Sequence, residues 1–419
     1  MKIYKFGGAS VRDAAGIRNL SAIVSQENAN LVIVVSAMGK TTNALEIVLK
    51  SWLAGEKVWK DHLEAIYLYH HNVLEGLLTD VSGIDKLLSA SFNELRSWLS
   101  CSKPVNFDHD YDQVVSYGEL WSTIILSGFF DQTGIKQKWL DIRSLIVTDE
   151  RFRDANIIWD LSAEKICSTI NFSDTGIYIT QGFIGSTLRG KTTTLGREGS
   201  DYTAAVLANI LNAVSVTVWK DVPGLLNADP KWLPDARKMD EVSYREAVEM
   251  TFSGAKVIHP KTIKPLQNKN IPLYVKSFLA PQDDGTLVTS EPQLKKIIPV
   301  FIRKENQLLV TLLPRDFSFV MGDNLSRIFY LFMNQGIKVN LVEASAVSID
   351  VCIDNDKSKT ESLLKSLRND YSVLYNENVE LLTVRHYDED SVKRISGDRE
   401  ILLEQRTRST VRFVARVAG

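Results

Sequence analysis

Short, largely apolar runs rich in Val and Ile constrain the fold of this 419-residue chain more than any other feature of its sequence. They recur through the first two thirds of the chain, at residues 31–35, 177–180, 214–219 and 273–275. A strand that is apolar on both faces suits a parallel sheet that helices cover on both sides. Helical patterns separate the runs, and a long stretch from Asn43 to Leu99 indicates a helical insertion. The sequence therefore predicts an α/β fold with an open, mostly parallel sheet sandwiched by helices.

A turn-rich passage around Pro281-Gln282-Asp283-Asp284-Gly285 ends this pattern. We therefore predict a first domain over residues 1–293 and a second region over residues 300–419. The apolar periodicity of the second region gives the order βαββαβ, which is typical of a ferredoxin-like α+β module, at about residues 305–378. The stretch after residue 388 has two short strands but little room for a full helix, so a second module is predicted to be abbreviated.

The composition excludes several classes of function. The 49 basic and 51 acidic residues give a formal net charge of -2, and no block of like charge suggests affinity for nucleic acid or an anionic membrane. The chain shows neither an apolar signal region nor a run long enough to span a membrane, so we expect a cytoplasmic protein. Cys101, Cys167 and Cys352 are scattered, which favours inert thiols over disulfides or a zinc site.

A glycine pair follows the first predicted strand. In Lys5-Phe6-Gly7-Gly8-Ala9-Ser10, glycines let backbone N–H groups approach phosphate oxygens, and Lys5 adds a compact positive charge. An ordinary strand-to-helix turn would explain the same pair. The segment from Ser36 to Asn43 follows the second strand, where open α/β sheets bind ligands. Its hydroxyls suit substrate or phosphate oxygens, although Thr41 or Thr42 would also serve as a helix cap.

Two further polar segments suit an amino-acid substrate. Glu119, in Ser116-Tyr117-Gly118-Glu119, would accept hydrogen bonds from a substrate ammonium, or would only complement a helix dipole. Arg197 offers a bidentate guanidinium for a carboxylate, and Ser200 and Asp201 open the next apolar helix. Because a helix N-terminus binds anions, capping and function are compatible there.

The predicted strand that ends at Trp219 is followed by segments suited to a nucleotide. Lys220-Asp221-Val222-Pro223-Gly224 and Asn227-Ala228-Asp229-Pro230-Lys231 follow it, and Lys256 would supply a second cation to the phosphates. We interpret His259, which precedes a proline in an apolar setting, as a packed core histidine rather than a general base. Ser243 and Glu246 fit a helix capping box.

The order of four motifs identifies a family resemblance. Lys5-Phe-Gly-Gly, Ser116-Tyr-Gly-Glu119, Gly196-Arg-Glu-Gly-Ser-Asp201-Tyr202 and Gly254-Ala-Lys-Val-Ile-His-Pro260 occur as in the aspartate kinases of the amino acid kinase family. The chain resembles them over essentially its whole length, including a C-terminal regulatory ACT region. The resemblance implies ATP- and Mg²⁺-dependent phosphorylation of the side-chain carboxylate of L-aspartate. The product, 4-phospho-L-aspartate, leads to lysine, threonine and methionine.

The resemblance also implies roles for particular residues. Lys5, Asp201 and Lys256 would be catalytic, with Asp201 also on the metal side. Aspartate would contact Ser36, Thr42, Glu119, Arg197 and Ser200. The nucleotide would contact Lys5, Gly7, Gly8, Ser10, Lys220, Asp221, Leu226, Asp229, Lys231 and Lys256. An amino-acid effector would face Asn340, Ala344 and Ser345, and the ACT region would form a homodimer or higher homo-oligomer.

Some positions depart from the family pattern. The family usually has Thr where Ala9 and Lys220 stand, and Tyr where Leu226 stands. Asn340 stands where lysine-sensitive members commonly have an acidic residue, so sensing of lysine, of threonine or of nothing remains open. Two other functions are also open. One is a kinase of the same fold that acts on acetylglutamate, glutamate or carbamate, and the other is an amino-acid sensor without turnover.

Overall fold

The computed structural model describes residues 1–255, 258–293, 297–315 and 322–416. The chain forms two compact units, and each of them is assembled from separate segments. Unit 1 comprises Met1–Leu225, Lys238–Val248 and Val257–Gln293, and unit 2 comprises Leu226–Arg237, Glu249–Lys256 and Leu294–Gly419. Two segments before residue 293 therefore belong to unit 2. Whether the chain divides functionally at 293 stays a prediction.

Unit 1 is built on an eight-stranded sheet in the order β3-β5-β2-β1-β8-β10-β11-β9. All neighbouring strands are parallel except β10 and β11. The strands are β1 (Lys2–Phe6), β2 (Leu31–Val35), β3 (Lys138–Leu140), β5 (Ile177–Gln181), β8 (Ser215–Lys220), β9 (Glu241–Ser243), β10 (Leu273–Ser277) and β11 (Thr286–Thr289). The four predicted apolar runs lie in β2, β5, β8 and β10, which confirms the predicted fold class. A small second sheet contains β4 (Val147–Thr148), β6 (Ile184–Thr187) and β7 (Thr192–Thr194).

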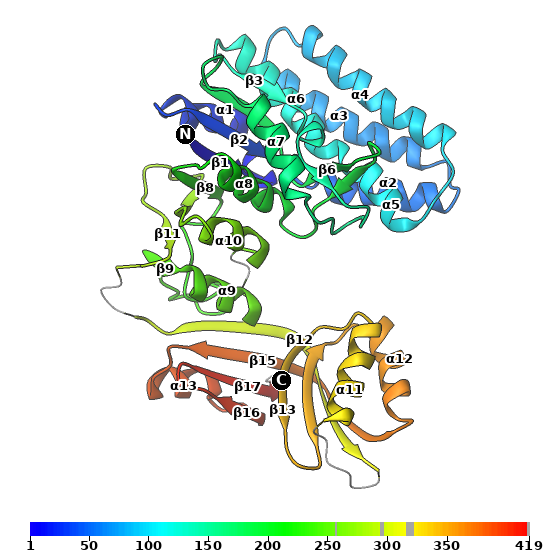
Figure 1. The fold of residues 1–419 in the computed structure, drawn as a ribbon, viewed down its shortest axis with the longest axis vertical. Coiled ribbons are helices and arrows are strands. Elements are labelled where there is room, and N and C mark those ends of the chain that lie inside the picture. The colour runs from blue at the N-terminus through cyan, green and yellow to red at the C-terminus, as the bar shows by residue number, and fades with distance from the viewer. Residues whose placement is uncertain (256–257, 294–296, 316–321, 417–419) are drawn as a thin grey trace. The chain divides into compact units, whose positions relative to one another are not determined.

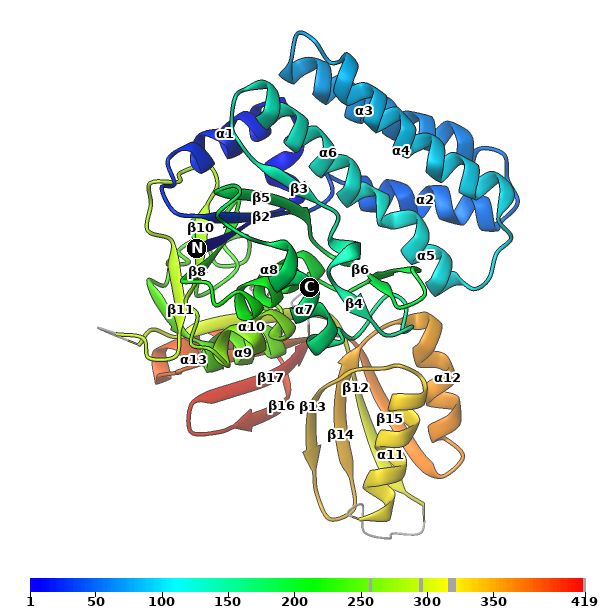
Figure 2. The same cartoon turned by 45° about the horizontal axis from the view of Figure 1, so that its top comes forward.

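Helices surround this sheet. They are η1 (Gly8–Val11), α1 (Ala14–Ser25), α2 (Thr41–Leu53), α3 (Trp59–Leu77), α4 (Ser82–Cys101), α5 (Phe107–Val115), α6 (Tyr117–Gln132), η2 (Ile142–Ser144), α7 (Trp159–Thr169), α8 (Gly199–Ile210), α9 (Tyr244–Ser253) and α10 (Pro260–Gln267). The predicted helical insertion corresponds to α2, α3 and α4, and α3 and α4 lie side by side near α6 (Figures 1 and 2). Phe92 of α4 stacks on the buried Trp121 of α6, with ring centroids 3.6 Å apart. The insertion is thus anchored on α6, the helix that also carries Glu119.

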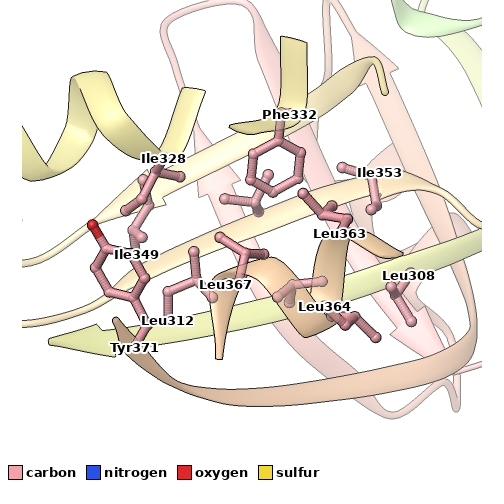
Figure 3. Packing of buried hydrophobic residues seen from close by; sticks show 12 residues of the cluster. Leu308, Leu312, Ile328, Phe332, Ile349, Ile353, Leu363, Leu364, Leu367 and Tyr371 are labelled. Atoms are coloured by element: carbon pink, nitrogen blue, oxygen red, sulfur yellow. The ribbon is translucent and has the colours of Figure 1, made fainter. Parts of the chain in front are cut away.

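Unit 2 contains an antiparallel six-stranded sheet in the order β13-β14-β12-β15-β17-β16. Its elements are β12 (Val300–Pro314), α11 (Asp323–Asn334), β13 (Val339–Ala344), β14 (Ile349–Asp354), α12 (Lys357–Leu367), β15 (Tyr371–Arg385), α13 (Glu389–Ser396), β16 (Ile401–Arg406) and β17 (Thr410–Arg416). The predicted βαββαβ order is therefore present. Ile328 and Phe332 of α11, together with Leu363 and Leu367 of α12, point onto the sheet and form a closed apolar core with Ile353 (Figure 3).

Two long strands divide this sheet into halves. The pairing of β12 with β15 shifts register between Lys304 and Gln307. On one side of the shift β12 pairs with β14, and on the other side β15 pairs with β17. The second half is short in sequence because it shares both long strands with the first. The stretch after residue 388, which we expected to have little room for a full helix, contains the eight-residue α13 behind a capping box of Asp388 and Ser391.

Candidate active site

A cavity of about 600 Å³ opens where β1, β2 and β8 end at the N-terminus of α8. These three strands are neighbours in the sheet, so their carboxyl ends bring distant segments together. The following predicted site residues line the cavity: Lys5, Gly7, Gly8, Ser10, Ser36, Thr42, Glu119, Arg197, Ser200, Asp201, Lys220 and Asp221. Ala9, which lacks the hydroxyl usual in the family, also lines it.

Lys5 and Asp201 form a buried ion pair at the floor of the cavity. The Lys5 ammonium lies 2.6 Å from Oδ1 of Asp201, and the Lys220 ammonium lies 3.9 Å from Oδ2. Burial by itself would raise the pKa of Asp201, but the two ammonium groups outweigh it, and the pKa is lowered. Asp201 is therefore ionised at neutral pH, beside two cations that face the cavity.

The glycine-rich turn after β1 packs backbone to backbone against the turn after β2. The N–H of Gly39 donates to the carbonyl oxygen of Gly8 at 3.0 Å. A Cβ atom at Gly8 would lie 2.7 Å from the carbonyl oxygen of Ala37, closer than a side chain can come. Gly8 is thus required for close approach of the two turns, so the cavity wall there consists of backbone.

Glu119 is a buried carboxylate with spare capacity for a hydrogen bond. Its side chain is on α6, and the residue is 3% exposed. Oε1 accepts the backbone N–H of Ala37 at 3.3 Å, whereas Oε2 is buried without a partner among the residues that the structure describes. Burial raises the pKa of Glu119 to about 8, although the Lys5 charge opposes this. A cationic partner from a ligand would stabilise the ionised form.

Arg197 supplies the complementary charge. Its guanidinium is exposed at the cavity, and no ion-pair partner for it occurs in the described parts of the chain. Ser200 lies in the first turn of α8 and is buried in the cavity wall. A cavity that offers an unpaired guanidinium and a buried carboxylate is suited to a ligand with both a carboxylate and an ammonium group.

The N-terminus of α8 is fixed by an unusual backbone conformation. Glu198 has φ 54°, in the left-handed region that is costly for a residue with a Cβ. Its Oε2 accepts the backbone N–H of His259 at 2.8 Å. His259 is half-buried, and its Nδ1 accepts the N–H of Lys261 at 3.3 Å, which caps α10. The interpretation of His259 as a packed core residue was therefore wrong, since the ring is occupied with helix capping.

Several lining residues were missed from the sequence. They are Tyr111, Arg153, Phe183, Thr194, Glu198, Gly199 and Trp219. The Arg153 guanidinium lies over the ring of Tyr111, 4.7 Å from its centroid. Arg153 stands in an irregular loop and Thr194 in a three-residue strand, so neither follows an apolar run that would mark it.

Asp112 holds both missed polar residues in place. Its Oδ2 accepts the backbone N–H groups of Arg153 at 2.9 Å and of Thr194 at 2.8 Å, and its Oδ1 accepts the Thr194 hydroxyl at 2.7 Å. Burial raises the pKa of Asp112 to about 6, although these hydrogen bonds lower it. Asp112 is a positioning residue for one wall of the cavity. In the sequence it is indistinguishable from the other acidic residues at the start of α5.

Four other predicted nucleotide residues are not among the described residues of unit 1. Leu226, Asp229 and Lys231 belong to unit 2, where Oδ1 of Asp229 accepts the N–H of Lys231 at 2.9 Å within a turn. Lys256 lies outside the described residues. The roles of these four residues stay predictions.

The predicted effector residues lie at one edge of the sheet of unit 2. Asn340 of β13 is 6% exposed, and its amide is fully engaged. Its Nδ2 donates to Gln307 Oε1 and Asp354 Oδ1, both at 2.8 Å, and its Oδ1 accepts from Lys304 Nζ at 2.7 Å. Ala344 and Ser345 are exposed. Of the three predicted residues, Ala344 and Ser345 are exposed to a ligand, and the Ser345 hydroxyl bonds to Ser348.

Neither a metal cluster nor a membrane span is found in what the structure describes. No group of three or more His, Cys, Asp or Glu side chains in the described ranges could hold a metal ion. None of the described helices is long and apolar enough to cross a membrane.

Comparison with known proteins extends these observations. The model of the amino acid kinase family matches residues 1–277. Lysine-sensitive aspartokinase 3 of Escherichia coli (strain K12) is 34% identical over 380 residues, or 87% of this chain and 82% of that protein. The crystal structure of E. coli aspartokinase III in complex with aspartate and ADP (R-state) has a TM-score of 0.85 and 30% identity, covering 99% of this chain and 96% of that chain. The same enzyme in complex with lysine and aspartate (T-state) has a TM-score of 0.83 and 30% identity, covering 99% and 95%.

Proposed function

Because the chain belongs to the amino acid kinase family and, within it, to the aspartokinases, we propose that it phosphorylates L-aspartate at the expense of ATP. The reaction transfers the γ-phosphoryl group to the side-chain carboxylate and yields 4-phospho-L-aspartate and ADP. This is the first step of the pathway to lysine, threonine and methionine. A solved relative holds aspartate and ADP together, as such a reaction requires.

The single observation that carries this substrate assignment is the unpaired, buried Oε2 of Glu119. A substrate α-ammonium would supply the missing donor, and the Arg197 guanidinium would bind the α-carboxylate through paired hydrogen bonds. With both charged ends fixed, the remaining carboxylate is held toward Lys5. Ser36, Thr42 and Ser200 supply hydroxyls to the same cavity.

Charge stabilisation in this site falls to Lys5 and Lys220. Phosphoryl transfer demands positioning and charge compensation rather than covalent chemistry from the protein. Lys5 is held by Asp201 so that its ammonium faces the phosphoryl group, and backbone N–H groups of the glycine-rich turn lie beside it. In this proposal Lys220 contacts the nucleotide phosphates, and Asp221 lines the same cavity.

The residues present fit a magnesium ion. Mg²⁺ in phosphoryl-transfer sites takes one or two carboxylates and completes its shell with phosphate oxygens and water, so a protein cluster of three ligands is not needed. Asp201 is a buried, ionised carboxylate with a lowered pKa, as a Mg²⁺ ligand must be. When bound with ATP, the ion would supply charge neutralisation at the phosphate oxygens.

The geometry favours aspartate over two of the rival acceptors. Acetylglutamate and carbamate lack a free α-ammonium group, so either would leave Glu119 buried and unpaired. Glutamate has the ammonium group but places its side-chain carboxylate one methylene farther from Arg197. An amino-acid sensor without turnover would not need the buried Lys5–Asp201 pair.

Regulation belongs to the ACT region in this proposal. An amino-acid effector binds at the exposed end of β13 near Ala344 and Ser345, and the sheet of unit 2 pairs with that of a second chain. One solved relative contains lysine as well as aspartate, which supports an amino acid as the effector class.

An acceptor panel tests the function. ADP release is measured with ATP and Mg²⁺ in the presence of aspartate, glutamate, acetylglutamate or carbamate, and the acyl phosphate is trapped with hydroxylamine. We expect turnover and hydroxamate formation with aspartate alone. Faster turnover with another acceptor would replace the substrate assignment, and binding of aspartate without any turnover would favour the sensor.

A further inference from the structure

A second cavity of unit 1, of about 450 Å³, lies on the face of the sheet that α1 partly covers. Strand residues and the end of α1 line it: Lys2, Tyr4, Ile23, Gln26, Glu27, Val214, Ser215, Thr217, Trp219, Pro272, Tyr274, Lys276 and Pro281. We call it the α1-face cavity. Apart from Trp219, it shares no lining residue with the active-site cavity.

Strand register explains why aromatic rings gather there. Tyr4, Thr217 and Tyr274 are paired across β1, β8 and β10, and Trp219 and Lys276 are paired one pleat farther along. Side chains opposite each other in parallel strands share a face of the sheet. The Tyr4 ring meets the Trp219 ring edge to face at 5.6 Å. The wall of the cavity therefore contains two nearly perpendicular aromatic rings, against which a planar ligand would pack.

The indole of Trp219 has an unused donor in this wall. The residue is 3% exposed, and its Nε1 is buried without a hydrogen-bond partner among the described residues. Strand register places Trp219 on the face shared by Tyr4 and Lys276, and Trp219 lines this cavity as well as the active-site cavity. A buried N–H without an acceptor costs free energy that an acceptor from a ligand would restore.

The charges of the cavity leave one cation uncompensated. The Lys2 ammonium lies 2.9 Å from Oε2 of Glu27, which also accepts the Tyr4 hydroxyl at 2.5 Å, while Oε1 accepts the N–H of Ala29 at 3.1 Å. Glu27 is thus satisfied by its own neighbours. The Lys276 ammonium lies over the Trp219 ring, 5.6 Å from its centroid, and has no carboxylate partner in the described ranges.

From these features, we infer that the α1-face cavity binds a small aromatic carboxylate. The ligand ring packs against the Tyr4 and Trp219 rings, facing one and meeting the other edge-on, and its carboxylate accepts from Lys276 Nζ and from the indole N–H. The hydroxyls of Ser215 and Thr217 line the same cavity and can donate as well. Neither the kinase reaction nor the proposed effector residues of unit 2 require this site.

The α1-face cavity is linked to the active-site cavity through β8. Trp219 immediately precedes Lys220, whose ammonium lies 3.9 Å from Asp201 Oδ2. A ligand that fixes the Trp219 ring therefore also fixes the end of β8 that supports Lys220. Binding should change kinase kinetics without competition against aspartate.

Calorimetric titration of the full-length chain tests the site with indole-3-acetate as the probe. Indole-3-acetamide controls for the charge, and cyclohexaneacetate controls for the aromatic ring. We expect saturable binding of the aromatic anion, and affinities about tenfold lower for both controls, as expected for loss of one charged hydrogen bond or one stacking contact. Binding should persist in saturating aspartate and ADP.

Variants assign the binding to this cavity. Lys276→Gln should lower the affinity for indole-3-acetate about tenfold and leave the affinity for indole-3-acetamide unchanged. Lys86→Gln, which alters an exposed lysine of α4, should change neither. Trp219→Phe should also weaken the binding of indole-3-acetate. If Trp219→Phe does not fold, Lys276→Gln still tests the site. Absence of saturable binding, equal affinity in Lys276→Gln, or displacement by aspartate would each overturn the proposal.

Discussion

The Lys5 ammonium lies 2.6 Å from Oδ1 of Asp201, and this pair joins the first strand of the sheet to the first turn of α8. Both residues are buried, and they come from segments nearly two hundred positions apart in the sequence. The ammonium is paired with an ionised carboxylate, so this charge is positioned before any nucleotide binds.

Replacement of Lys5 tests this preorganised charge. Lys5→Ala should lower kcat by about 10² to 10³, because a charge aimed at the transition state acts mainly on turnover. Steady-state kinetics of the purified variant give the value, with Lys86→Ala at an exposed position of α4 as the matched control. Circular dichroism should show a folded variant, and a folded Lys5→Ala enzyme with most of its activity would make Lys5 purely structural.

Replacement of Arg197 tests whether its guanidinium binds the substrate carboxylate. Arg197→Lys keeps the charge but loses the paired hydrogen bonds, so KM for aspartate should rise about tenfold or more while KM for ATP stays within about twofold. The same kinetics on Arg189→Lys, an exposed arginine outside the cavity, provide the control. An unchanged KM for aspartate would remove Arg197 from the substrate site.

The raised pKa of Glu119 predicts opposite pH effects on stability and on binding. Between its ordinary value of 4.5 and about 8, the folded state holds a proton that the unfolded state has released, so the free energy of unfolding falls as pH rises through this window. Glu119→Gln has no such proton. We therefore expect urea denaturation to show a change in the difference between the two proteins. The free energy of unfolding of Glu119→Gln minus that of the native chain should be more positive at pH 8 than at pH 5.

Aspartate affinity should follow the same titration in the other direction. Ionised Glu119 accepts from the substrate ammonium, so KM for aspartate should fall as pH rises from about 6 to about 8 in the native chain. Glu119→Gln should have a higher KM that does not depend on pH in this range. A pH-dependent KM that survives in Glu119→Gln would assign the titration to another group.

The sequence predicted well those parts of the site that follow regular strands. Lys5, Ser36 and Lys220 stand at or just beyond the ends of apolar runs, and carboxyl ends of adjacent parallel strands must meet. Arg153 and Thr194 were not predicted, because tertiary contacts such as their hydrogen bonds to Asp112, rather than an apolar run, bring them to the cavity.

Unit assignment shows a second limit of sequence reasoning. Ala228 lies between two elements of unit 1 in the chain, yet it packs in a core of unit 2 with Phe301, Leu382 and Phe413. Trp232 packs against the same cluster. A single boundary at residue 293 does not separate the two units, because the chain enters unit 2 at Leu226 and returns to unit 1 at Lys238.

This interleaving predicts the behaviour of a truncated chain. A chain ending near Gln293 would leave Ala228 and Trp232 without Phe301 and Phe413, so it should expose apolar surface and lose cooperative unfolding. Size-exclusion chromatography and thermal denaturation would report this. A monodisperse, cooperatively unfolding truncation would show that the 226–237 segment does not depend on unit 2. Effector sensing is therefore better tested with point variants of the full chain.

Two such variants separate effector contact from internal structure. Ser345→Ala removes an exposed hydroxyl that bonds only to Ser348 in the described chain, so stability should stay within about 0.5 kcal/mol. If Ser345 faces the effector, inhibition by lysine or threonine should weaken several-fold with basal kinetics unchanged. Asn340→Ala instead leaves Gln307 and Lys304 short of partners and should cost about 1 to 3 kcal/mol in urea denaturation. Normal stability of Asn340→Ala together with lost inhibition would mean that Asn340 serves the effector rather than the sheet.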